Sequence, residues 1–196
     1  DGSVRPITRD AASPTYDRPY AGGGFSVARN GAVAFTTSPY NRPTDVAVAS
    51  GGAVRQLTRL NDLTLSAKNL GTLRDFVATA PDGGKVPSWI LLPPNYQPGQ
   101  RVPTILEIHG GPYAAYGPHF STDYQQYAAA GYAVLYTNPR GSTGYGRAFG
   151  NAINNAYPGQ DYDDLMRGVD EVVRRGYVDE RNLFVTGGSG GGVLTT

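Results

Sequence analysis

Ser189 is the residue whose surroundings in the sequence most clearly predict chemistry. It stands in the run Gly187-Gly188-Ser189-Gly190-Gly191-Gly192, which contains the pattern G-x-S-x-G directly after the apolar residues 183–185. A sharp turn between a strand and a helix uses this pattern to expose a serine hydroxyl, and Val193-Leu194 could open such a helix. Small neighbours let the helix begin without a collision. We therefore predict that Ser189 is the nucleophile of an acyl-transfer reaction.

Phosphate binding is the other chemistry that a glycine-rich turn after a strand can perform. The spacing argues against it, because G-x-G-x-x-G starting at Gly188 needs a glycine where the chain has Val193, and no Gly-Lys-Ser/Thr follows. The pattern G-x-S-x-G also arises easily by chance in a chain with 27 glycines. The position of the pattern directly after a predicted strand is what favours the interpretation of Ser189 as a nucleophile over a chance match.

A second glycine-rich turn, His109-Gly110-Gly111-Pro112, follows the apolar residues that end at Ile108. Glycine lets a backbone amide approach a developing oxyanion without a Cβ in the way. In α/β-hydrolases the oxyanion hole combines the amide after the nucleophile with one from the loop after the third strand. We predict that the amides of Gly190 and Gly111 fill these two places. Standing alone, His-Gly-Gly-Pro would be interpreted as an ordinary turn.

Three motifs in this order resemble the catalytic domain of prolyl oligopeptidase-family peptidases, closest to the acylaminoacyl peptidase and dipeptidyl aminopeptidase branch. They are the His109–Pro112 turn, the run Asn138-Pro139-Arg140-Gly141-Ser142-Thr143-Gly144-Tyr145-Gly146, and the turn around Ser189. The resemblance implies a serine peptidase that cleaves short peptides. Many family members carry tyrosine where this chain has Gly190, so the oxyanion hole should survive while one side-chain wall of the pocket is lost.

The resemblance also implies a catalytic aspartate and histidine, in the chain order Ser, Asp, His. Residues 190–196 contain neither. We expect a companion chain or a missing C-terminal half to supply both, and we expect this chain alone to be inactive. His109 and His119 lie upstream, so His109 is interpreted as structural and His119 as a surface or pocket-wall residue. Homo-oligomerisation of the complete protein stays open.

Other polar and aromatic residues have simpler interpretations. Arg140 is a candidate for holding a substrate carboxylate or carbonyl, although a structural ion pair is favoured. Acids at a helix start usually act as caps and dipole partners, which is how we interpret Asp161, Asp163 and Asp164. Tyrosines in the predicted oxyanion loop and the helix after it are expected to pack rather than to recognise substrate, namely Tyr113, Tyr116 and Tyr124.

The elements before residue 70 have an all-β pattern. Short apolar runs at 25–28, 33–36 and 45–49 are separated by turn residues, as in a meander of hairpins. Such a meander cannot bury a face alone. Residues 57–61 and these strands resemble the end of the β-propeller that caps the family's hydrolase domain, so residues 1–70 are predicted as its C-terminal part. A small independent β domain is the alternative.

Residues 71–196 alternate strands with helices and are predicted as the N-terminal half of an α/β-hydrolase domain. Helices are expected at 121–131, after a Ser121 cap, and at 162–175. The expected strands are 74–79, 89–92, 104–108, 133–136 and a short buried strand at 183–185. This alternation predicts an incomplete, mostly parallel sheet with helices on both faces.

Composition excludes several classes of function. The formal charge is +1 and no basic run stands out, so neither nucleic acid nor a membrane is an expected partner. With no cysteine and two histidines, no metal or other cofactor is expected. No apolar stretch reaches about 18 residues, so a soluble protein is expected, of bacterial cytoplasmic or exported type. A carboxylesterase on the same fold and a non-catalytic binding module remain alternatives to the peptidase.

Overall fold

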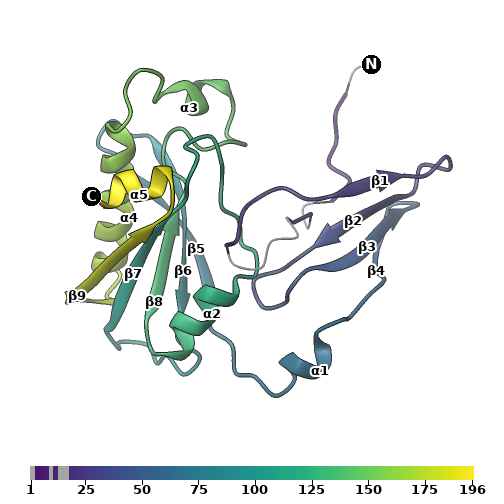
Figure 1. The fold of residues 1–196 in the computed structure, drawn as a ribbon, viewed down its shortest axis with the longest axis horizontal. Helices are drawn as coiled ribbons and strands as arrows, with labels where there is room; N and C mark the ends of the chain where they lie inside the picture. Colours follow the sequence, from purple (N-terminus) through teal and green to yellow (C-terminus); the bar gives the residue numbers. More distant parts are fainter. Residues whose placement is uncertain (1–2, 9–10, 13–17) are drawn as a thin grey trace.

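Two β-sheets make up the computed structural model, which describes residues 3–8, 11–12 and 18–196 (Figure 1). The first sheet is an antiparallel meander in the order β1-β2-β3-β4. Its strands are β1 (Phe25–Val27), β2 (Val33–Thr37), β3 (Asp45–Ser50) and β4 (Ala53–Gln56). A short helix, α1 (Asp62–Leu65), which the sequence analysis did not predict, leads to the second sheet.

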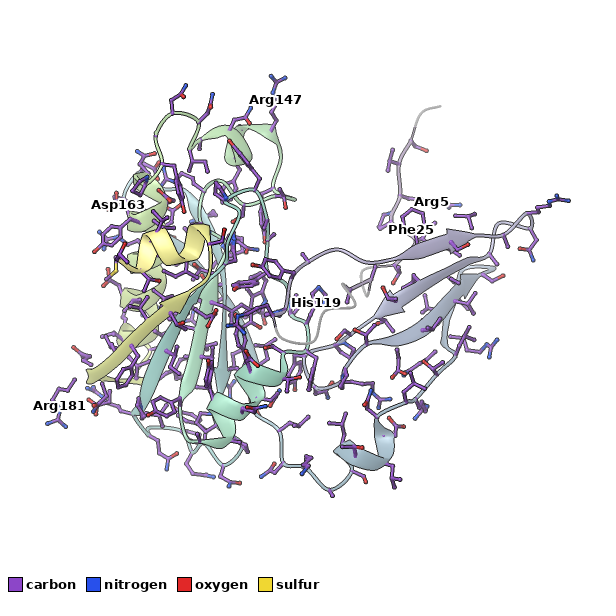
Figure 2. All side chains as sticks on the ribbon, in the orientation of Figure 1. Arg5, Phe25, His119, Arg147, Asp163 and Arg181 are labelled. Atoms are coloured by element: carbon purple, nitrogen blue, oxygen red, sulfur yellow. The ribbon has the colours of Figure 1, made fainter. Side chains whose placement is uncertain are left out.

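The first sheet has a small core. Phe35, Ala47 and Ala49 are buried together, whereas Phe25 on β1 is 74% exposed (Figure 2). One meander therefore leaves large apolar side chains in solvent, because so few strands are too small to bury a face of their sheet without a packing partner. The membership of this sheet in a propeller, and a domain boundary at residue 70, stay predictions.

The second sheet has five strands in the order β5-β6-β8-β7-β9. They are β5 (Thr72–Thr79), β6 (Lys85–Leu92), β7 (Val102–Ile108), β8 (Ala133–Thr137) and β9 (Val178–Gly187). Strand β6 is antiparallel to both of its neighbours, while β8, β7 and β9 are parallel. Only β6 therefore opposes the common direction of the other four strands, and two of the four strand pairs are parallel.

Helices cover both faces of this second sheet (Figure 1). They are α2 (Thr122–Ala129), α4 (Gln160–Arg174) and α5 (Gly190–Thr195), while the short helix α3 (Arg147–Asn151) lies in the connection between β8 and α4. The Ser121 side chain caps α2 by accepting a hydrogen bond from the Tyr124 amide at 3.2 Å. Helix α3 was not predicted. None of the helices in the described part of the chain is both long and apolar enough to cross a membrane.

Side chains alternate between two buried layers along β6 and β8. On the α2 side, Trp89 and Tyr136 stack in an aromatic cluster, their ring centroids 5.5 Å apart. On the α4 side, Ile90 and Leu135 pack against Leu165. Burial on both faces fixes the register of these strands, since a shift by one residue would exchange the two layers.

The prediction of a buried strand at 183–185 was wrong about its burial. Leu183, Phe184 and Val185 are 41%, 49% and 46% exposed. They belong to the longer strand β9, which lies at the edge of the sheet and pairs only with β7. An edge strand lacks the second neighbour that would cover its side chains, and a run of apolar residues does not reveal the strand's place in the sheet.

Residues 18–21 lie along the predicted oxyanion loop. Tyr20 forms an antiparallel bridge with Tyr116, and the Ala21 amide donates to the Ala115 carbonyl at 2.7 Å. A second bridge joins Pro39 to His119, whose Nδ1 donates to the Ser38 carbonyl oxygen at 3.1 Å. His119 therefore lies where the two sheets meet (Figure 2), in the wall of a cavity, and burial lowers its pKa.

Candidate active site

Ser189 occupies the turn between β9 and α5 in a strained conformation. Its φ is 57° and its ψ is −120°, a region that costs a residue with a side chain about 1–3 kcal/mol. The residue is exposed, and its side chain forms no hydrogen bond that caps α5. The sharp turn predicted from G-x-S-x-G is present, and Ser189 lines a cleft of about 640 Å³.

The glycines around Ser189 allow the backbone to approach strand β7. A Cβ at Gly191 would lie 2.1 Å from the Ile108 carbonyl oxygen, and one at Gly187 would lie 2.6 Å from the carbonyl carbon of Gly191. Both distances are far inside van der Waals contact. Residues with side chains at these two positions would therefore push α5 away from the end of β7.

The loop after β7 brings Gly110 and Gly111 beside the nucleophile. A Cβ at Gly110 would lie 3.2 Å from the Ser189 Cβ, and one at Gly190 would lie 3.3 Å from the Gly111 amide nitrogen. Gly111 has φ 134°, where side chains are strained. The two amides predicted for the oxyanion hole thus come from neighbouring segments next to Ser189.

His109 is buried and both of its ring nitrogens are engaged. Because a carbonyl oxygen can only accept, Nδ1 carries the proton and donates to the Gly110 oxygen at 2.9 Å. Nε2 then accepts from the Ser142 hydroxyl at 2.9 Å. Burial lowers the pKa of His109, and the hydrogen bond to Gly110 opposes this shift. His109 therefore holds the loop in place and is not free to act as a base for Ser189.

Two further contacts hold the oxyanion loop, and the sequence analysis missed both. The Tyr20 hydroxyl oxygen accepts from the Gly110 amide at 3.2 Å. The Asn138 side chain accepts from the Tyr116 amide at 2.8 Å and donates to the Tyr116 carbonyl oxygen at 2.9 Å. Tyr20 is 90 residues from Gly110, so no local pattern could have indicated the first contact.

Charged side chains line the cleft beside Ser189. Arg18 pairs with Asp123 and donates from Nε to Glu107 Oε1 at 2.8 Å. Glu107 is 1% exposed, and its Oε2 has no hydrogen-bond partner among the described residues. Burial raises the pKa of Glu107, and the Arg18 guanidinium opposes the rise.

Arg140, a candidate for substrate binding, instead lies in an ion-pair network apart from the residues that line this cleft. Its guanidinium donates to both carboxylate oxygens of Asp164, at 2.9 and 2.6 Å, and to Asp82 at 2.7 Å. Asp164 is 1% exposed. Such a two-point pairing of a buried carboxylate is the structural ion pair that the sequence analysis favoured.

The remaining candidates differ in their surroundings. Asp161 accepts from the Gly159 amide at 2.6 Å, in agreement with its interpretation as a cap, whereas Asp163 points into solvent (Figure 2). Tyr116 and Tyr124 are buried in the aromatic cluster, and Tyr113 is 56% exposed. Packing therefore accounts for the first two tyrosines and not for the third.

Tyr157 is a side chain at the site that the sequence analysis did not consider. It is half-buried in the segment between α3 and α4, and its hydroxyl donates to the Gly190 carbonyl oxygen at 2.6 Å. Burial, and to a smaller extent the nearby Asp161, raise the pKa of Tyr157. Its phenol therefore keeps its proton at neutral pH.

Comparisons with known proteins agree with this geometry. The model of the prolyl oligopeptidase family matches residues 118–196. The uncharacterized peptidase YuxL of Bacillus subtilis is 40% identical over 165 residues, which cover 83% of this chain and 25% of the relative. Dipeptidyl aminopeptidase BIII of Pseudoxanthomonas mexicana is 42% identical over 94 residues, which cover 48% of this chain and 14% of the relative.

A solved structure is similar over the full chain. The acylaminoacyl peptidase of Pyrococcus horikoshii superposes with a TM-score of 0.83 at 28% identity, covering 100% of this chain and 30% of that one. The chain thus spans about a quarter of the length of the first of these relatives and under a third of the solved structure. Both sheets take part in the similarity.

Proposed function

Since the chain belongs to the prolyl oligopeptidase family through residues 118–196, we propose that Ser189 is the nucleophile of a serine peptidase that cleaves short peptides. The activity would be of the dipeptidyl-peptidase or acylaminoacyl-peptidase kind that the names of its relatives describe. One observation carries the proposal. Ser189 is an exposed serine at positive φ, beside the amides of Gly111 and Gly190.

The reaction would begin when the Ser189 hydroxyl oxygen attacks the peptide carbonyl carbon and gives its proton to a histidine. The negative charge that develops on the carbonyl oxygen would be stabilised by hydrogen bonds that the amides of Gly111 and Gly190 donate. The amine product would leave with the proton from the histidine. Water would then hydrolyse the Ser189 ester, releasing the acid and restoring the hydroxyl.

The histidine and the aspartate that orients it would come from a companion chain or from a further segment of the complete protein. His109 does not fit the role because both of its nitrogens are bonded to other groups. The exposed edge strand β9 supports an additional partner, since Phe184 and Val185 form an apolar hollow with Met166 of α4. Further strands and helices beside β9 would cover it.

Labelling with a fluorophosphonate tests the nucleophile in a complete protein that contains this chain. We expect wild type to be labelled and Ser189→Ala to be unlabelled and inactive. Paired substrates with the same acyl group, one a peptide amide and the other a short ester, separate a peptidase from a carboxylesterase. Turnover of esters alone would contradict the peptidase, and a failure to label wild type would mean that the site is a relic.

A further inference from the structure

Tyr157 bonds directly to the residue that follows the nucleophile. Its hydroxyl lies 2.6 Å from the carbonyl oxygen of Gly190, across 33 residues of sequence. A carbonyl oxygen only accepts, so the phenol is the donor. The distance is at the short end of the usual range for O–H···O hydrogen bonds. The contact therefore links the segment between α3 and α4 to the first turn of α5.

The same phenol fills the space beside Gly190. A Cβ at residue 190 would lie 3.0 Å from the Tyr157 hydroxyl oxygen and 3.3 Å from the Gly111 amide nitrogen. A side chain at position 190 would therefore require the phenol and the Gly111 peptide to move by a few tenths of an ångström. Tyr157 thus provides, from another part of the chain, a side chain that stands against the Gly190 segment of the predicted oxyanion hole.

The first turn of α5 needs an external restraint of this kind. It consists of Gly190, Gly191 and Gly192, and the Ser189 side chain does not cap it. Each glycine in a helix interior is about 1 kcal/mol less favourable than alanine, because glycine loses more backbone freedom on folding. A helix of six residues is also too short to be stable by itself. Contacts from other segments of the chain must therefore set the backbone conformation at Gly190.

We propose that Tyr157 is a positioning residue for acyl transfer, whose hydroxyl holds the carbonyl group of Gly190 and, through the Gly190 Cα, restrains the preceding peptide, whose N–H would donate to the developing oxyanion. This inference rests on the proposed function of Ser189. The oxyanion exists only near the transition state, so a misdirected amide lowers kcat and leaves substrate binding unchanged. Loss of an oxyanion donor costs about 10²–10³ in kcat, and loss of its support costs less.

The test uses Tyr157→Phe in the complete protein, because phenylalanine keeps the ring and removes the hydroxyl. We expect kcat to fall roughly tenfold with KM within about twofold of wild type, as for the loss of a transition-state interaction. Each rate is divided by the concentration of Ser189 that a fluorophosphonate labels, so unfolded protein does not affect the measured kcat. Tyr162→Phe, at an exposed tyrosine five residues further along the chain in the first turn of α4, is the control and should match wild type.

A double-mutant cycle with Gly190→Ala separates positioning from general stability. The new Cβ meets the Tyr157 hydroxyl oxygen in wild type but not in Tyr157→Phe, so Gly190→Ala should reduce kcat less in the Tyr157→Phe background. Wild-type kcat in Tyr157→Phe, a change confined to KM, or additive effects would each overturn the inference while Ser189→Ala remains inactive. Activity that survives Ser189→Ala would instead overturn the proposed function.

Discussion

Gly191 lies against the carbonyl oxygen of Ile108 so closely that a Cβ at residue 191 would be 2.1 Å from that oxygen. Ile108 is the last residue of β7 and Gly191 is in the first turn of α5. The two segments that carry Gly111 and Gly190 are therefore held together by backbone contact. The relative position of Ser189 and the loop after β7 depends on the absence of a side chain at residue 191.

We predict that Gly191→Ala destabilises the chain by about 1–3 kcal/mol or more, because the added methyl group forces α5 away from β7. Gly192→Ala is the matched control. A Cβ there would lie 3.4 Å from the Gly187 carbonyl oxygen, an ordinary contact, so this change should be neutral or stabilising. Urea unfolding of both variants measures the difference. Equal stability of the two would contradict the close approach.

The chain of residues 1–196 by itself should not turn over a chromogenic peptide ester above the background rate. Its two histidines are held elsewhere, His109 by Gly110 and Ser142, and His119 by Ser38. Without a base, the hydroxyl of Ser189 is a weak nucleophile at neutral pH. Initial rates for the chain and for Ser189→Ala decide the matter, and a fast rate that Ser189→Ala abolishes would refute this prediction.

Arg140→Lys should destabilise the protein without raising KM. Lysine cannot reproduce the two-point contact with the buried Asp164, so we expect a loss of about 1–3 kcal/mol in the free energy of unfolding. Arg167→Lys is the control, because the Arg167–Asp170 pair is exposed and should contribute less than about 1 kcal/mol. Steady-state kinetics accompany the unfolding curves. A higher KM at unchanged stability would instead support a role of Arg140 in substrate binding.

Stability should decline as the pH falls below about 6.5, the ordinary pKa of histidine. Burial lowers the pKa of His109 in the folded chain, so the unfolded chain binds this proton more readily. The stabilisation is thus complete above 6.5 and is lost as the pH falls toward the folded-state value, by at most about 1.4 kcal/mol per pH unit. Between pH 7 and pH 5, the free energy of unfolding should decline less in His109→Asn than in wild type. If it declines equally in both proteins, His109 is not responsible for the loss of stability.

Local patterns predicted those parts of the fold and site that depend on neighbouring residues. The helix after Ser121 and the sharp turn at Ser189 follow from residues a few positions apart. The helix predicted at 162–175 likewise corresponds to α4, in which Leu165 and Val172 are fully buried. Periodicity and capping are short-range signals, and a single sequence contains them in full.

Contacts between distant segments could not be predicted in the same way. Arg140 and Asp164 are 24 residues apart, and Tyr157 and Gly190 are 33 apart. Nothing in the composition of either segment selects its partner, because many other acids, tyrosines and glycines would fit equally well. The exposure of Phe184 was missed for a related reason, since the order of strands in a sheet is a property of the whole fold.

The path of residues 18–21 beside the oxyanion loop has a practical consequence for protein engineering. A catalytic unit excised at the apparent sequence boundary near residue 70 would lack Tyr20, whose hydroxyl oxygen accepts a hydrogen bond from the Gly110 amide, and Arg18, the cationic partner of Glu107. An expression clone intended to retain a native cleft should therefore include the segment from Arg18 onward, or supply it as a separate peptide.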